Sequence, residues 1–131
     1  MTDRKAFHAP SAPPAIGPYS PALQCGEWVF TSGQLPITDT GELIVDDAAA
    51  ATRQALANVK TLLEAAGSRL EDVVKVTVFV TDLSTFGAIN KAYAPFFRDP
   101  PPARSCVEVR ALPMGAPLEI EAVARRRPAH A

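Results

Sequence analysis

The period of the hydrophobic pattern changes near residue 70, and this change limits the folds that the chain can adopt. Over residues 47–66 apolar side chains recur every three or four positions with charged ones between them, a pattern that predicts a helix with one buried face. Gly67 can end this helix in the left-handed conformation. Residues 74–80 then alternate, with four valines on one side of a strand. A helix packed on a sheet, in an α+β fold, follows from the two segments.

Turn residues and alternation predict the remaining elements. Four more strands are expected over residues 19–24, 28–33, 101–109 and 118–124. A second helix is expected over residues 84–97, with a final turn that Pro95 distorts or displaces because proline lacks an amide donor. The predicted order is β-β-α-β-α-β-β, with both helices on one face of the sheet.

Alternation also assigns side chains to the two faces of this sheet. In the last two strands the residues expected to face the core are Val107, Val109, Ile120 and Ala122. The residues expected on the uncovered face are Lys75, Thr77, Arg104, Cys106, Glu108, Glu119 and Glu121. A large face of mixed polarity predicts oligomerisation, with pockets where subunits meet. If the last two strands pair as a hairpin, Arg104 and Glu119 lie roughly 15–20 Å apart, so a shared site needs another strand order or a second subunit.

Length and charge limit the possible functions. The 131 residues fit one domain, 1–131, in which residues 1–14 form an extended, proline-rich N-terminal arm and residues 125–131 a C-terminal tail. A formal net charge of −1 lacks the positive field on which general nucleic-acid binding depends. No apolar run has the length of a signal peptide or a membrane span, which predicts a cytoplasmic protein without membrane contact.

Cysteine and histidine usage argues against a metal site. Cys25 and Cys106 are expected to be two reduced thiols, since a single pair without secretion signals stays unpaired. His8 and His130 lie in the two tails, and the sequence has no Cys-x-x-Cys. We therefore expect no bound metal.

Three polar residues of the last two strands are candidates for chemistry. Arg104 can grip a substrate carboxylate, because its guanidinium presents paired donors in a rigid fork; a structural ion pair is the alternative. Glu119 or Glu121 could hold a water as a general base, and strand parity does not separate the two. Cys106 has no histidine in a folded segment to activate it, so an inert thiol is expected.

Three further positions are weaker candidates. Tyr19 stands in a Pro/Gly loop, where its ring can line a pocket or simply pack. Residues 31–34 end a strand with small side chains, so that backbone donors can approach a ligand, although a plain turn is the default explanation. Asn90 lies on the second helix.

Several motifs occur together and in order. They are Ala-Ile-Gly-Pro-Tyr at 15–19, Phe-Thr-Ser-Gly-Gln-Leu-Pro at 30–36, Asn-Val-Lys at 58–60, Leu-Glu-Ala-Ala-Gly at 63–67, the alternating strand at 74–80 and Pro-Ala-Arg-Ser-Cys-Val-Glu-Val at 102–109. Over about residues 15–124 the chain resembles the RidA/YjgF family of enamine/imine deaminases.

The resemblance implies a fold, an assembly and a reaction. The fold would be chorismate-mutase-like, a mixed sheet with two helices on one face, assembled as a homotrimer with three sites between subunits. The reaction would be the hydrolysis of reactive 2-imino acids and their enamine tautomers, such as 2-iminopropanoate and 2-iminobutanoate, to 2-oxo acids and ammonia. No cofactor is implied.

The resemblance also assigns roles to residues. Arg104 would grip the substrate carboxylate, while Glu119 and the backbone carbonyl of Cys106 would hold the attacking water. Four residues would shape the pocket: Tyr19, Ser32, Gly33 and Asn90. Because an imine carbon is already electrophilic, orientation and a placed water are the main requirements.

The chain departs from the family pattern at two places. The segment 97–102 is shorter and richer in proline than the same segment in the best-known members, which can alter the rim of the cleft. The position of Pro95 within the second helix is also unusual.

Two other functions stay open. One alternative is a non-catalytic module that binds small carboxylates or a protein client. The other is an RNA-cleaving inhibitor of translation, which the near-neutral charge disfavours.

Overall fold

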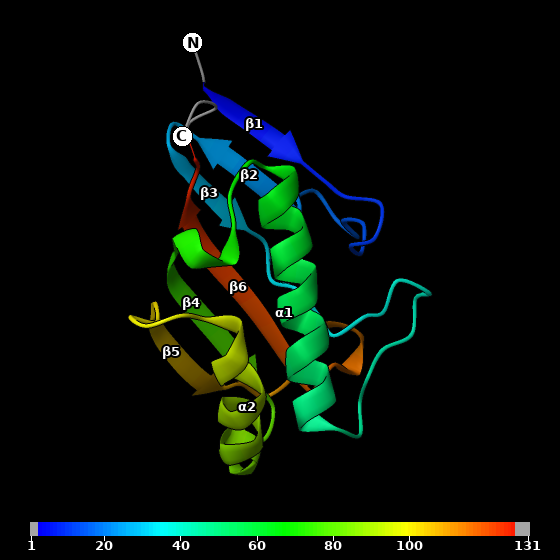
Figure 1. Cartoon of the computed structure of the whole chain (residues 1–131). Coiled ribbons are helices and arrows are strands. Elements are labelled where there is room, and N and C mark those ends of the chain that lie inside the picture. Colours follow the sequence, from blue (N-terminus) through cyan, green and yellow to red (C-terminus); the bar gives the residue numbers. More distant parts are fainter. Residues whose placement is uncertain (1–2, 128–131) are drawn as a thin grey trace.

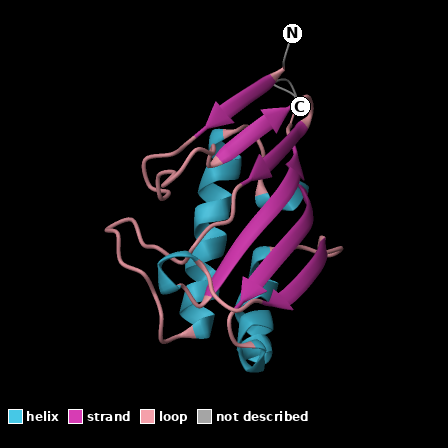
Figure 2. Cartoon of the chain, turned by 180° about the vertical axis from the view of Figure 1, so that it is seen from behind, coloured by secondary structure: helices cyan, strands magenta, loops and turns pink. Residues whose placement is uncertain are grey.

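The computed structural model describes residues 3–127, which form one mixed sheet with two helices on a single face (Figure 1). The strands are β1 (Arg4–Phe7), β2 (Ala22–Cys25), β3 (Trp28–Thr31), β4 (Val73–Val80), β5 (Ala103–Glu108) and β6 (Leu118–Arg125). The helices are α1 (Ala48–Ala65) and α2 (Phe86–Tyr93), with 3-10 turns η1 (Leu70–Asp72), η2 (Leu83–Thr85), η3 (Ala94–Phe96) and η4 (Pro113–Gly115). Seen from behind, the second face of the sheet is covered by neither α1 nor α2 within residues 3–127 (Figure 2).

The strand order is β1-β2-β3-β6-β4-β5, so β6 lies between β3 and β4. Only the β4–β5 pair is parallel among the described strands; the other pairs are antiparallel. The predicted mixed sheet with two helices on one face is confirmed. The hairpin considered for the last two strands does not form, because the connection through η4 carries the chain across β4 before β6 begins.

The N-terminal segment contributes a strand that the sequence did not predict. Arg4–Phe7 pairs antiparallel with Ala22–Cys25 as the edge strand of the sheet. Only the part after it is irregular and proline-rich, and there Ala12 is buried against Ala22 and Leu62. The expected C-terminal tail begins inside β6, which ends at Arg125, and residues 128–131 lie outside the described residues.

The long helix agrees closely with its prediction. The Asp47 side chain caps α1 by accepting a hydrogen bond from the Ala50 amide at 3.0 Å. Gly67, at φ +82°, turns the chain away after the helix. The apolar stripe of α1 packs on β6 and β3 and against α2, in a core that includes Leu56, Val59, Leu63, Val76, Val78, Ile89 and Ile120, all with 0% exposure.

The second helix is shorter than expected, for the predicted reason. Regular α-helix ends at Tyr93, and Pro95 falls in the 3-10 turn that follows. In β4 the predicted valine face holds at residues 76, 78 and 80 but fails at Val74, which is exposed. A register shift between Val73 and Lys75 against β6 turns Val73 inward instead.

The predicted faces of β5 are wrong. Arg104 and Cys106 align with the buried Val76 and Val78 of β4, so they lie on the face that the helices cover, as does Glu108. Val107 lies on the open face, where 42% of it is exposed. At this edge of the sheet, α2 places the Tyr93 ring and the Asn90 side-chain amide next to Arg104. These groups accept the polar guanidinium, so an arginine can point inward here. The prediction for Glu119 and Glu121 holds, since they align with Phe79 and Thr77 on the open face.

The open face is partly apolar. Side chains on it include Trp28, Phe30, Phe79, Val107 and Val123, of which Trp28, Phe30 and Val107 are exposed. Neither helix within residues 3–127 has the length and apolar character needed to cross a membrane.

Candidate functional site

Four of the predicted site residues border one depression on the open face of the sheet. Tyr19, Ser32, Gly33 and Glu119 line an open cavity of about 480 Å³. The other lining residues are Ile16, Thr31, Pro113 and Glu121. The depression therefore brings together the loop before β2, the end of β3 and the start of β6.

Gly33 is placed against Glu119 by the pairing of the chain after β3 with β6. The amide of Gln34 donates to the Ile120 carbonyl at 2.8 Å, and the Ile120 amide donates back to the Gln34 carbonyl at 3.0 Å. A Cβ atom on Gly33 would overlap the Glu119 carboxyl group. Glycine is thus needed here for close approach, and it leaves the carboxylate beside a backbone without a side chain.

Glu119 is half-buried beside a second carboxylate. Burial raises the pKa of Glu119 above its usual value, and the neighbouring Glu121 carboxylate raises it further. A carboxylate shifted in this direction is a better proton acceptor near neutral pH. This environment separates Glu119 from Glu121, which strand parity alone did not do.

The loop residues of the depression are held by local hydrogen bonds. The Ser32 hydroxyl donates to the Ser20 carbonyl at 2.7 Å, and the Ser32 amide donates to the Pro21 carbonyl at 2.8 Å. The Tyr19 hydroxyl accepts a hydrogen bond from the Ile16 amide at 3.1 Å. The bond from Ile16 holds the Tyr19 ring at the rim, where this residue is 45% exposed.

The other predicted site residues lie on the helix-covered face, next to α2. Arg104 Nη2 donates to Asn90 Oδ1 at 2.7 Å. The Arg104 Cζ atom lies 4.7 Å from the centroid of the Tyr93 ring and 5.6 Å from that of Phe86. Within residues 3–127 no carboxylate forms an ion pair with this guanidinium. Its remaining donors are therefore available to an external anion.

Cys106 offers its backbone rather than its thiol. Burial raises the pKa of the Cys106 thiol, and the nearby Arg104 cation offsets part of that effect, so the thiol is poorly suited to act as a nucleophile. The Val109 amide donates to the Val80 carbonyl, so the backbone groups of Val109 point toward β4. Successive residues of a strand point their amide and carbonyl to alternate sides. Those of Cys106, three residues earlier, therefore point toward the outer edge of the sheet. The carbonyl that the resemblance implicates thus faces the open edge of β5.

The predicted residues form two groups on opposite faces of the sheet. Arg104, Asn90 and Cys106 are on one side, and Glu119 is on the other with Tyr19, Ser32 and Gly33. One copy of the chain does not bring the two groups into one pocket.

Two members of the Arg104 environment are absent from the predicted site residues. These are Phe86 and Tyr93, which flank Asn90 at intervals of four and three residues on α2. Their role becomes visible only once the pairing of β5 beside α2 is known.

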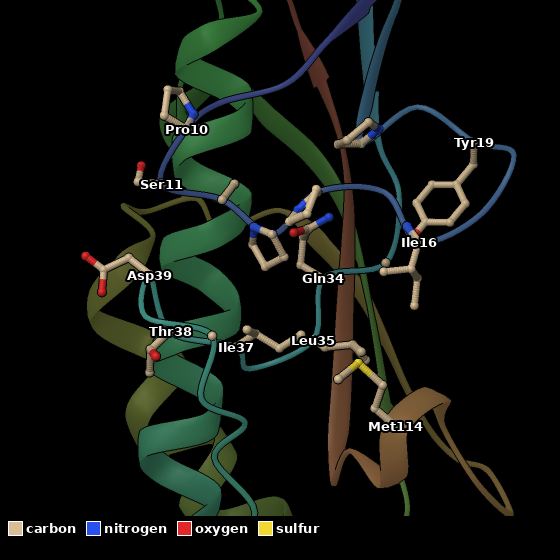
Figure 3. Close-up of a pocket in the computed structure, with 16 residues that line it drawn as sticks. Pro10, Ser11, Ile16, Tyr19, Gln34, Leu35, Ile37, Thr38, Asp39 and Met114 are labelled. Carbon is tan, nitrogen blue, oxygen red and sulfur yellow. Dashed lines mark hydrogen bonds between the residues drawn. The ribbon is translucent and has the colours of Figure 1, made fainter.

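A narrower crevice adjoins the depression (Figure 3). It has a volume of about 240 Å³ and lies between the proline-rich segment around Pro10 and Ser11 and the loop from Gln34 to Gly41, with Met114 at one end. Ile16, Tyr19 and Gly33 line both spaces. Within residues 3–127 no three His, Cys, Asp or Glu side chains gather in a way that could hold a metal ion.

Comparison with known proteins gives consistent matches over the described fold. Residues 9–126 match the family model described as Endoribonuclease L-PSP. Two curated relatives are each described as 2-iminobutanoate/2-iminopropanoate deaminase. The one from Salmonella typhimurium is 46% identical over 126 residues, covering 94% of this chain and 98% of its own length. The one from Escherichia coli K12 is 49% identical over 127 residues, with coverage of 94% and 98%.

A solved structure shares the architecture. The crystal structure of E. coli TdcF with bound serine gives a TM-score of 0.87 at 43% identity, covering 94% of this chain and 99% of that one. The residues matched by the family model, 9–126, include both helices and both groups of candidate site residues.

Proposed function

The chain belongs to the Endoribonuclease L-PSP family, that of the RidA/YjgF proteins, and from this premise we propose that it hydrolyses reactive 2-imino acids to 2-oxo acids and ammonia. The substrates are small imines such as 2-iminopropanoate and 2-iminobutanoate, the compounds in the names of the two relatives. The observation that carries the proposal is an oriented guanidinium, Arg104, without a carboxylate partner in the described chain.

The proposed active site lies between two copies of the chain. The open face carries Glu119 and exposed apolar side chains, which a second copy of the chain would shield from water. The edge strand β5 carries Arg104 and Cys106. Placing the β5 edge of one copy near the depression of the next joins the two groups of residues. A closed ring of copies, which we take to be a homotrimer, repeats this contact at every interface.

The reaction needs binding, a placed water and proton transfer. Arg104 binds the substrate carboxylate through paired donors and so fixes the adjacent C=N carbon. Glu119, with the Cys106 carbonyl, holds a water and accepts its proton as the oxygen bonds to that carbon. The C=N π pair moves to nitrogen, which takes up a proton. In the resulting carbinolamine the hydroxyl proton passes through Glu119 to the amino group. The carbon–nitrogen bond then breaks, its electron pair leaves with ammonia, and an oxygen lone pair forms the carbonyl.

The pocket residues have supporting roles in this proposal. The absence of a side chain at Gly33 leaves space beside the Glu119 carboxylate. Tyr19 and Ser32 form the rim, and Asn90 orients Arg104. No metal or cofactor takes part, and we place the protein in the cytoplasm, where such by-products of amino-acid metabolism arise.

The test uses an imine formed in solution. A threonine dehydratase generates 2-iminobutanoate, and the release of 2-oxobutanoate is compared with its uncatalysed rate. We expect clear acceleration by the wild-type chain. For Arg104→Ala we expect kcat/KM to fall roughly 10- to 150-fold, which corresponds to the loss of one charge-assisted hydrogen-bonded pair. Full activity of this variant would refute the role of Arg104. Carboxylate binding without acceleration would favour a non-catalytic binding module, and RNA cleavage by pure protein that Arg104→Ala abolishes would favour the ribonuclease.

A further inference from the structure

We infer that Tyr93 and Phe86 are positioning residues that hold the Arg104 guanidinium by its faces and leave its edge free for the substrate carboxylate. This rests on the proposed function, in which Arg104 binds that carboxylate.

The contacts come from one stripe of α2. Phe86, Asn90 and Tyr93 are spaced by four and three residues, so they lie on the same side of the helix, toward β5. The two rings lie 5.6 Å and 4.7 Å from the guanidinium carbon, within the range of cation–π attraction. Asn90 occupies one donor group, at 2.7 Å. The stripe therefore restrains Arg104 through its π faces and a single amide contact.

This mode of restraint leaves the positive charge uncompensated. A glutamate on α2 would also orient the arginine, but it would take up the paired donors that a carboxylate ligand needs. An aromatic ring attracts the cation without occupying its N–H groups. The helix thus supplies orientation while the charge stays available to a ligand.

The Tyr93 ring is itself held in place. It is 7% exposed, and its centroid lies 4.8 Å from that of the Phe97 ring. Burial raises the pKa of Tyr93 to about 12, against a smaller opposing effect of Arg104, so the ring stays neutral and its hydroxyl adds no anion next to the guanidinium. A neutral, fixed ring is suited to act as a platform for the guanidinium.

The experiment measures binding of 2-oxobutanoate, the product of the proposed reaction, by calorimetry. Tyr93→Leu should raise its Kd roughly 5- to 30-fold, and Phe86→Leu by about 2- to 5-fold because that ring is farther away and more exposed. Tyr93→Phe keeps the ring and should bind within about 2-fold of wild type. Phe96→Leu, at a core-packed ring outside this contact, is the matched control and should leave Kd unchanged.

A double-mutant cycle separates positioning from a structural role. In the Arg104→Met background no cation is left for the rings to hold, so adding Tyr93→Leu should change Kd by less than about 2-fold. In turnover, Tyr93→Leu should raise KM with kcat nearly unchanged. Three outcomes would overturn the inference. They are an equal loss of affinity in both backgrounds, an unchanged Kd for folded Tyr93→Leu or Phe86→Leu, and no binding of 2-oxobutanoate by the wild type. Binding that follows the cycle without any imine turnover would refute the proposed function alone.

Discussion

Arg104 and Glu119 lie on opposite faces of the same sheet, on strands separated only by β4. Residues on opposite faces of one sheet cannot hold the same small molecule between them. If both act in one reaction, each must act with its counterpart on another copy. This relationship makes the assembly of copies part of the proposed mechanism.

Complementation between two inactive variants tests this directly. Mixed trimers of Arg104→Ala and Glu119→Gln chains, isolated with two affinity tags, should recover about one third of wild-type activity, because one of three interfaces regains both residues. Each variant alone should be nearly inactive. The measurement is 2-oxobutanoate release by the purified mixture, and mixed trimers as inactive as the parents would contradict a site between copies.

Gly33→Ala should impair the site without unfolding the chain. The added Cβ overlaps the Glu119 carboxyl group, which must move, and a displacement of about 1 Å can cost roughly 100-fold in rate. Turnover and urea denaturation are measured together. Gly87→Ala is the matched control, since nothing lies within 4 Å of its added Cβ, and in α2 it should add up to about 1 kcal/mol of stability. Normal turnover by Gly33→Ala would mean that the Glu119 position is not critical.

The pH profile should respond to Glu121. Burial and the Glu121 carboxylate both raise the pKa of Glu119, so Glu121→Gln should lower it. The general base then remains ionised at lower pH, and the acidic limb of kcat/KM should move to lower pH. Glu42→Gln, at an exposed loop position, should leave the limb in place. A limb that moves to higher pH for Glu121→Gln would contradict this electrostatic coupling.

The Tyr93 hydroxyl offers a test of stability. It is buried and has no hydrogen-bond partner within the described residues. Leaving such a group unpaired costs about 1–3 kcal/mol, so Tyr93→Phe should keep or raise the free energy of unfolding, by about 1 kcal/mol. Urea denaturation of the two proteins measures the change. A loss of more than about 1 kcal/mol would indicate that the assembled protein supplies a partner to this hydroxyl.

The sequence predicted the elements whose local patterns decide their structure. The helical period before Gly67, the alternation from residue 75 to residue 80 and the displaced turn at Pro95 all agree with the structure. The four-residue β1 escaped detection because Arg4 and Lys5 give it no apolar alternation, and its pairing with β2 is set by tertiary contact.

The site was harder to predict than the elements. Motif resemblance gathered its residues, but their distribution over two faces depends on β6 entering between β3 and β4. The predicted face of β5 is wrong because a period of two fits either face, and the alternation favours valine as the inward residue. On this strand the arginine is inward instead, since α2 provides rings and an amide for it.

The central place of β6 has a consequence for biosynthesis. Until residues 118–125 have left the ribosome, β1–β3 and β4–β5 remain two separate ribbons, each with an unpaired edge. Neither ribbon can form the sheet by itself, because β6 is the strand that joins them. The whole sheet therefore cannot be paired before residues 118–125 are available, and until then the facing edges of β3 and β4 stay open to other strands.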